Sequence, residues 1–218
     1  MKYDLLLKYP VIDQNTVRKL YGAKKEYAYL VLQRLEKKGI IKKVEKGKYT
    51  ALDIYSTASN MAQPSYISFL TASMLKGATE QIINTVQIAS NYNKEIDYEN
   101  YTLEFIKVKY MFGYQKEKHI FIADNEKLLL DMLYYRNHAG NFSEIIKVTE
   151  TLDFKKEKII HYLKKFNNNS LIKRSGYLLE KYKGMDINDS FEIDRNYVQL
   201  DLLSNGKKVD SKWRVKYD

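Results

Sequence analysis

The stretch from residue 24 to residue 52 places the strongest constraint on how this chain folds. Apolar residues recur there three and four positions apart as far as Gly39, which is the pattern of a helix. Two short strand-like runs then flank Glu45-Lys46-Gly47, where the glycine supplies the positive φ that a tight hairpin favours. A helix followed by a two-stranded hairpin is the order in which a winged helix-turn-helix sets one helix in the DNA major groove and the hairpin beside it. The segment therefore predicts a DNA-binding element.

The residues before this stretch supply the helices that such an element needs. A short helix is expected over residues 2–9, ended by Pro10, and a second from an N-cap at Asp13 to Leu20. Gly22 closes the second helix, and a short turn leads into the third. Four residues of the third helix share one side and are predicted to pack on the first two helices: Ala28, Val31, Leu32 and Leu35.

The residues expected to contact DNA lie outside this apolar stripe or at the hairpin tip. They are Lys24, Lys25, Tyr27, Tyr29, Gln33, Arg34, Lys46 and Lys48. Lysine and arginine neutralise phosphates or bond guanine, and glutamine pairs with an adenine edge. Leu30 also points outward, where it either touches a thymine methyl group or packs on a neighbour. The alternative interpretation of this surface is an ordinary solvated helix face.

The positive charge of the chain is concentrated at the same end. The net charge is +10, and residues 1–58 hold 13 of the 37 Lys and Arg but only 6 of the 27 Asp and Glu, a net of +7. The remaining 24 basic and 21 acidic residues give +3. The codon habit of an AT-rich genome would spread lysine evenly, so the asymmetry favours binding to nucleic acid. Three later basic pairs are interpreted as solvated helix faces rather than a second basic patch: Lys155-Lys156, Lys164-Lys165 and Lys173-Arg174.

Small and polar residues over positions 53–64 suggest a domain boundary. We therefore expect an α+β protein, with a winged helix-turn-helix over residues 1–58 and a larger mixed sheet-and-helix domain over residues 59–218. The elements expected in the second part are helices at Tyr66–Lys76, Asn125–Tyr135, Lys155–Phe166 and Leu171–Tyr182, strands at Thr85–Ala89, Leu103–Val108 and His119–Ala123, and a hairpin over Tyr197–Tyr217. In that hairpin Asn205-Gly206 is the expected turn and Trp213 a buried anchor.

The sequence lacks the usual signatures of catalysis, so no enzyme, cofactor or metal site is expected. Cysteine is absent, the three histidines are far apart, and no phosphate-binding glycine motif or Gly-Ser dipeptide of a nucleotidyltransferase occurs. Glu126 and Asp131 are five residues apart on one expected helix and face different ways. No apolar run approaches the roughly 20 residues of a membrane span, and no signal peptide is recognisable. A cytoplasmic protein is expected.

Four short motifs, in order along nearly the whole chain, resemble the AbiEi family. These are Pro64–Ala72 with the following Gly77, Glu80-Gln81-Ile82 and Thr85-Val86; Ile122–Asp131; Gly176–Glu180; and Trp213-Arg214. The second is similar to the family's Ala-Asp-x-Glu-Lys-x-Leu-x-Asp stretch. The sequence departs from the family where Ile83 replaces a frequent proline and Ser175 a usual leucine.

The resemblance implies an antitoxin-type transcriptional repressor of an abortive-infection, viral-defence system. Such proteins bind double-stranded DNA repeats upstream of their own operon through the N-terminal winged helix, and the larger domain is linked to antitoxicity. The implied functional partner is the nucleotidyltransferase-like toxin AbiEii. The alternative is a stand-alone winged-helix regulator gated by a small ligand or protein partner, without a toxin. The sequence leaves the operator and the oligomeric state open.

Overall fold

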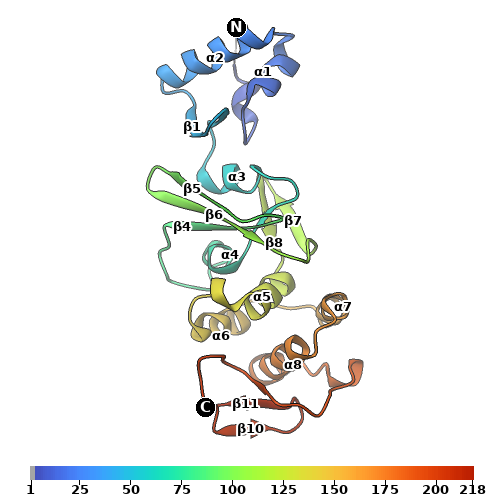
Figure 1. The fold of residues 1–218 in the computed structure, drawn as a ribbon. Coiled ribbons are helices and arrows are strands. Elements are labelled where there is room, and N and C mark those ends of the chain that lie inside the picture. The colour runs from blue at the N-terminus through green and yellow to red at the C-terminus, as the bar shows by residue number, and fades with distance from the viewer. Residues whose placement is uncertain (1–2) are drawn as a thin grey trace. The chain divides into compact units, whose positions relative to one another are not determined.

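Three helical elements begin the described part of the chain. In the computed structural model, which describes residues 3–218, they are η1 (Leu6–Lys8), α1 (Gln14–Tyr21) and α2 (Lys25–Lys37) (Figure 1). Asp13 caps α1 as predicted, because its carboxylate accepts a first-turn backbone N–H at 2.7 Å, and Gly22 ends α1 in the left-handed conformation. The helix predicted over residues 2–9 is wrong in extent. A single 3-10 turn forms, since Tyr9 is extended before Pro10, and residue 2 lies outside the described residues.

A hairpin shares one apolar core with these helices. Its strands, β1 (Lys42–Glu45) and β2 (Lys48–Thr50), are antiparallel, and Gly47 between them has the predicted positive φ, 80°. Backbone hydrogen bonds in both directions join Tyr49 to Ile12, at 2.7 and 2.8 Å. The four α2 residues predicted to face inward are all buried, in a cluster of Leu6, Ile12, Val17, Ala28, Val31, Leu32, Leu35, Ile41 and Tyr49. The hairpin is therefore part of the N-terminal core.

A six-stranded mixed sheet follows, in the spatial order β5-β6-β4-β3-β8-β7. Its strands are β3 (Tyr66–Ile67), β4 (Thr85–Ser90), β5 (Lys94–Tyr98), β6 (Tyr101–Lys107), β7 (Tyr114–Glu117) and β8 (Ile120–Ala123). β4 pairs parallel with β6 and β3 parallel with β8, whereas the β5–β6 and β3–β4 pairs are antiparallel. The predicted strands at β4, β6 and β8 are confirmed. β5 and β7 escaped prediction because they are polar edge strands, with sequences KEIDY and YQKE.

The helix predicted from Tyr66 to Lys76 is wrong in its first turn. Tyr66 and Ile67 form β3, which is held between β4 and β8 and has no exposed surface at either residue. The helix that follows is α4 (Phe69–Leu75), with Ser68 rather than Ser65 at its N-cap position. Pairing with two neighbouring strands overrides a local pattern that fits a helix equally well.

The small, polar segment near residue 58 is packed rather than loose. It contains α3 (Ile54–Ala58), which Asp53 caps by accepting the backbone N–H of Ser56 at 2.9 Å. The hydroxyl oxygens of Thr57 and Thr50 are 2.7 Å apart, and both residues are buried. The chain divides into two compact units, residues up to 67 with 84–111 and 115–122, and residues 68–83 with 112–114 and 123–218. The boundary at 58/59 stays a prediction.

Helices dominate the second unit. They are α4, α5 (Asn125–Tyr134), η2 (Arg136–His138), α6 (Phe142–Thr151), α7 (Lys156–Phe166), α8 (Asn169–Lys183) and η3 (Asn188–Ser190). The predicted helices at α5, α7 and α8 are confirmed, as is the Asp124 cap of α5. α6 was not predicted because Ile, Val and Thr make up half of its ten residues, and β-branched side chains have low helix propensity. α5 packs against α4, α6, α7 and α8 and so forms the centre of this unit.

The C-terminal hairpin is real, but its predicted turn is wrong. β10 (Lys208–Asp210) pairs antiparallel with β11 (Val215–Tyr217) through a turn at residues 211–214, and β9 (Val198–Gln199) pairs parallel with β11. Gly206 lies before this hairpin, where a Cβ would come within 2.7 Å of the Tyr217 nitrogen, so the glycine provides space rather than a turn. Trp213 is 1% exposed, which confirms the predicted anchor, and its Nε1 donates to Glu180 at 2.5 Å.

Candidate nucleic-acid interface

The exposed side of α2 carries six of the eight residues predicted to contact DNA. At 3.6 residues per turn, the side opposite the buried stripe is centred on Glu26, Leu30, Gln33 and Lys37. The other predicted helix residues lie along its two margins, with Lys25 and Tyr29 on one and Tyr27 and Arg34 on the other. Lys24 is the N-cap residue. One helix therefore exposes these six side chains across a broad arc, with Lys25 and Arg34 at its two edges, together with Lys37, which the same periodicity would have found.

The chemistry of this surface is basic and aromatic. Tyr27, Tyr29 and Leu30 are 43%, 47% and 44% exposed, whereas Gln33 is half-buried. The basic groups Lys24, Lys25 and Arg34 are exposed and form no ion pair with any residue of the described chain. Basic side chains without an ion-pair partner can bind phosphates directly, because no ion pair within the protein has to be broken first.

The two predicted hairpin lysines have different environments. Lys46 is exposed at the tip, without an ion pair in residues 3–218. The ammonium of Lys48 is half-buried; it lies 2.8 Å from the Glu45 carboxylate and donates to the Met61 carbonyl at 3.2 Å. Lys43 on β1 is exposed and was missed, although among the lysines of β1 and β2 it alone has no carboxylate partner in the described chain. The hairpin thus offers Lys43 and Lys46 outward, while Lys48 is held inside the unit.

Ion pairs fasten the hairpin to the sheet of the same unit. Glu45 is paired with Lys94 of β5 as well as with Lys48, and Lys42 lies 2.8 Å from Glu99, in the turn after β5. Burial tends to raise the pKa of Glu45, but the two lysines outweigh it and hold the pKa below its usual value. Val44 packs beneath them in a core with sheet residues. The hairpin is thereby fixed before any ligand binds.

A pocket of about 420 Å³ lies beside the hairpin in the first unit. Its lining includes Lys42 of β1, the loop after β2, and sheet residues at the β5–β6 turn: Gly39, Ile40, Lys42, Thr50, Ala51, Leu52, Asp53, Ile54, Tyr98, Glu99 and Tyr101. The charged groups that line it already have partners, since Lys42 pairs with Glu99 and Asp53 caps α3. A small molecule bound there would touch the base of β1.

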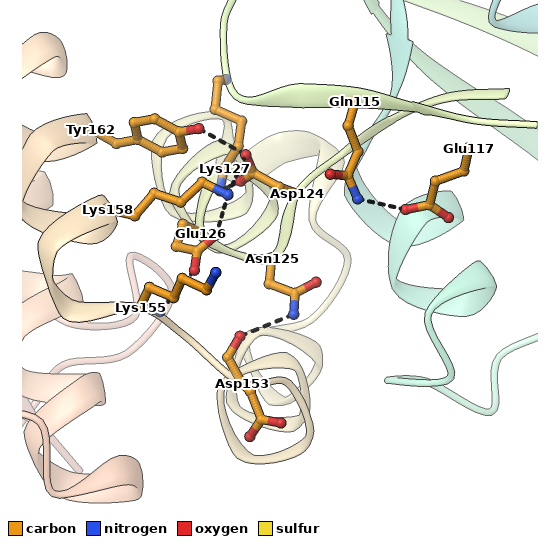
Figure 2. Close-up of polar contacts among 10 residues, drawn as sticks. All are labelled: Gln115, Glu117, Asp124, Asn125, Glu126, Lys127, Asp153, Lys155, Lys158 and Tyr162. Atoms are coloured by element: carbon orange, nitrogen blue, oxygen red, sulfur yellow. Dashed lines mark hydrogen bonds and ion pairs between the residues drawn. The ribbon is translucent and has the colours of Figure 1, made fainter.

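A second charged cluster, in the second unit, involves the motif Ala123–Asp131 (Figure 2). Lys158 lies 3.0 Å from the Asp124 carboxylate and 3.1 Å from that of Glu126, and Tyr162 donates to Asp124 at 2.8 Å (Figure 2). Burial, and then the bond to Asp124, raises the pKa of the Tyr162 hydroxyl. Asp131, wholly buried, pairs instead with Lys127. These carboxylates are used to join α5 to α7 and to balance a buried lysine.

This cluster does not have the arrangement of a metal or acid–base site. Glu126 and Asp131 have separate partners, and no group of three His, Asp or Glu residues in the described chain converges on a metal position. Gly113 lets the chain pass close by, because a Cβ there would lie 2.8 Å from the Tyr162 ring. The motif is explained by packing within the second unit.

One of the three basic pairs in the second unit is not a solvated face. Lys173 is 1% exposed, lies 2.6 Å from the Asp194 carboxylate and donates to the Asn196 carbonyl. Arg174 donates from Nε to the Gln199 carbonyl at 2.8 Å. Both side chains hold the segment before and along β9 against α8. The interpretation of Lys173-Arg174 as a solvated helix face is therefore wrong. The other two pairs, on and before α7, are exposed as expected.

Comparisons with known proteins establish the fold but not a family. No protein-family model matches the sequence, and no curated protein is similar to it. The crystal structure of the RV2827C protein from Mycobacterium tuberculosis superposes with a TM-score of 0.62 at 12% identity, over 94% of this chain and 85% of that one. The two proteins therefore share a mixed helix-and-sheet architecture, in agreement with the predicted α+β class. Among the helices of residues 3–218, none combines the length and apolarity that crossing a membrane requires.

Proposed function

We propose that this chain is a sequence-specific DNA-binding repressor of the antitoxin type, with a winged helix-turn-helix formed by η1, α1, α2 and the β1–β2 hairpin. The observation that carries the proposal is the exposed side of α2, where Lys24, Lys25 and Arg34 have no carboxylate partner in the described chain. The net charge of +7 on residues 1–58 supports it, because such a field attracts a polyanion.

In the proposed complex α2 enters the major groove. Gln33 and Arg34 supply the donors proposed to read base edges, and Leu30 is the apolar group for a thymine methyl. Lys24 and Lys25, at the start of the helix, bind phosphates with help from its N-terminal dipole. Lys43 and Lys46 of the hairpin bind the flanking backbone. Phosphate contacts set the orientation, and the base contacts of α2 set the sequence preference.

An electrophoretic shift with the DNA upstream of the chain's own gene tests this function. The expected result is binding to that fragment at least about a thousandfold tighter than to random DNA of equal length at physiological salt. Equal affinity for the two fragments would exclude specific repression. Glu26→Gln, which removes a negative charge from the exposed side of α2, is expected to strengthen binding to both fragments.

The antitoxin role rests on the resemblance to AbiEi proteins and on autoregulation that the resemblance implies. An adjacent gene for a nucleotidyltransferase-like protein is expected, and its product should slow growth unless this chain is co-expressed. Growth inhibition that co-expression does not relieve would contradict the antitoxin role while leaving DNA binding intact.

The pocket of about 420 Å³ beside the hairpin favours a second candidate, a stand-alone regulator gated by a small ligand. A ligand there contacts Lys42 and Glu99 and so competes with the ion pair that fastens β1. The two candidates differ in a simple observation. The ligand-gated regulator predicts no toxin gene next to this one, whereas the antitoxin predicts such a gene.

A further inference from the structure

A pocket of about 320 Å³ in the second unit is lined by two arginines and little negative charge. Its wall consists of the segment from Leu133 to His138 at the end of α5, Arg174 of α8, and Leu202. It lies among residues of the second unit and shares none with the DNA-contact candidates. Its volume is at the lower end of the range for small-molecule sites.

The Arg136 guanidinium is incompletely satisfied. Its side chain is 10% exposed, and Nη2 donates to the Asp201 carboxylate at 2.9 Å. The other two nitrogens, Nε and Nη1, are buried without an acceptor in the described chain. One face of the guanidinium stacks on the Phe142 ring, 4.8 Å from its centroid. A buried donor without an acceptor is destabilising, so the Arg136 side chain is only partly satisfied by the described chain.

Arg174 adds a second positive charge to the same wall. It donates to a backbone carbonyl, and no carboxylate of the described chain pairs with it. Burial lowers the pKa of Arg174, and the positive charge of Arg136 lowers it further. Asp201 balances one of the two charges, and the half-buried His138 lies in the same wall.

We infer that this pocket binds the phosphate group of a small molecule, held between Arg136 and Arg174. Guanidinium groups present planar N–H donors that match phosphate oxygens, and an anion in the pocket would balance the charge of Arg174, which no carboxylate of the described chain pairs with. Tyr134 and Tyr135 beside them provide an aromatic wall for the remainder of the ligand. The inference goes beyond the proposed function, because it needs neither DNA nor a toxin.

Calorimetric titration of the full chain with inorganic phosphate, at constant ionic strength, tests the inference. Saturable binding at one site is expected, and Arg174→Gln should weaken it about tenfold or more, because a charge-assisted hydrogen bond is lost. Arg174→Lys, which keeps the charge but not the planar donors, should give an intermediate affinity. The matched control is Arg195→Gln, an exposed arginine of the same unit, which should bind like the wild type.

Three results with the wild-type protein or the Arg174→Gln variant would overturn the inference. These are the absence of saturable binding to wild-type protein, a normal affinity in a folded Arg174→Gln variant, and binding of succinate in place of phosphate, which would indicate a carboxylate site. Loss of phosphate binding in the variant with Lys24, Lys25 and Arg34 all changed to alanine would also overturn it, because the phosphate would then occupy the DNA-contact surface. If the chain does not shift the upstream DNA fragment, the expected phosphate-binding results stay the same. The two proposals can therefore fail independently.

Discussion

Two leucines five residues apart on α2 have opposite environments. Leu35 is 2% exposed in the core shared with α1 and the hairpin, whereas Leu30 is 44% exposed on the opposite side. The difference follows from helical periodicity alone, and it separates the residues that maintain the fold from those available to a ligand.

Leu35→Ala should therefore lower the free energy of unfolding by about 2–5 kcal/mol, through lost apolar contacts and a residual cavity. Leu30→Ala, the matched control, should change it by no more than about 0.5 kcal/mol. Urea denaturation of both variants measures the two values. Equal losses would mean that the helix is rotated from the orientation described.

Gly176 and Trp213 are also explained at the residue scale. A Cβ on Gly176 would lie 2.1 Å from the Trp213 ring, so the glycine is required by the close approach of the indole to α8. Gly176 and Trp213, which belong to separate motifs of the sequence, therefore form a single packing contact. The sequence contained both motifs, but it offered no way to pair them.

Gly176→Ala should destabilise the protein by about 1–3 kcal/mol, because the indole must move. The sign of the change is diagnostic, because replacing glycine with alanine in a helix with open space around it normally raises the free energy of unfolding by about 0.5–1 kcal/mol. In a Trp213→Phe background the same substitution should cost less, and a double-mutant cycle from urea denaturation gives the coupling. A stabilising Gly176→Ala would show that no close contact exists.

At the scale of elements, the hairpin is held by ion pairs that depend on pH. Glu45 has a pKa below its usual value, so its ionised form is favoured by folding and its contribution is complete above the unfolded-state pKa of about 4.3. The contribution is lost as the pH falls from there through the lower folded-state pKa.

Glu45→Gln should accordingly reduce the free energy of unfolding by up to about 1 kcal/mol at pH 7, a modest value because Lys48 and Lys94 are partly exposed. The difference from wild type should shrink when the pH is lowered from 5 to 3. Glu26→Gln, on the exposed side of α2, is the control for removing one negative charge elsewhere in the same unit. A difference that grows toward low pH would contradict the ion-pair clamp.

The two hairpin lysines should differ in how they affect DNA binding. Lys46→Ala should reduce the slope of log affinity against log salt by about one unit, as expected for one lost phosphate contact. Lys48→Ala should change that slope less, because its ammonium is already engaged by Glu45 and the Met61 carbonyl. Binding isotherms from about 50 to 200 mM salt measure both slopes. A larger change of slope for Lys48→Ala than for Lys46→Ala would place Lys48, rather than Lys46, at the DNA backbone.

Elements differ in how far local sequence predicts them. The helices α1, α5, α7 and α8 were predictable because apolar periodicity, and in α1 and α5 an aspartate N-cap, act within one element. β3 was not, since a two-residue strand depends on β4 and β8, which lie elsewhere in the sequence. The C-terminal turn failed for a similar reason: Arg214 takes a positive φ of 53° there, and Asn205-Gly206 does not form the turn.

The residues of the candidate site likewise differ in how far the local sequence predicts their positions. Helical periodicity assigned the exposed side of α2, and a single missed residue, Lys37, follows from it. The partner of Lys48 could not be predicted, because Met61 meets the hairpin only through the packing of α3 and the loop after it against the sheet. The Arg136–Arg174 pair, 38 positions apart, likewise requires tertiary structure.

At the scale of the whole molecule, two units divide the chemistry between them. The first holds the basic helix and the fastened hairpin, and the second holds buried ion pairs and the arginine-lined pocket. A fold shared at 12% identity with the M. tuberculosis protein shows that this architecture tolerates nearly complete replacement of its residues. Functional assignment must therefore come from the exposed groups of this chain rather than from its fold.

The central claim is that α2 contacts DNA through its basic side. A gel shift on the upstream fragment with the variant carrying Lys24→Ala, Lys25→Ala and Arg34→Ala tests it most directly. Because the three side chains are exposed and unpaired within residues 3–218, the variant should unfold at the same urea concentration as the wild type. Binding should be abolished at physiological salt. A folded variant that binds the fragment with wild-type affinity would contradict the claim.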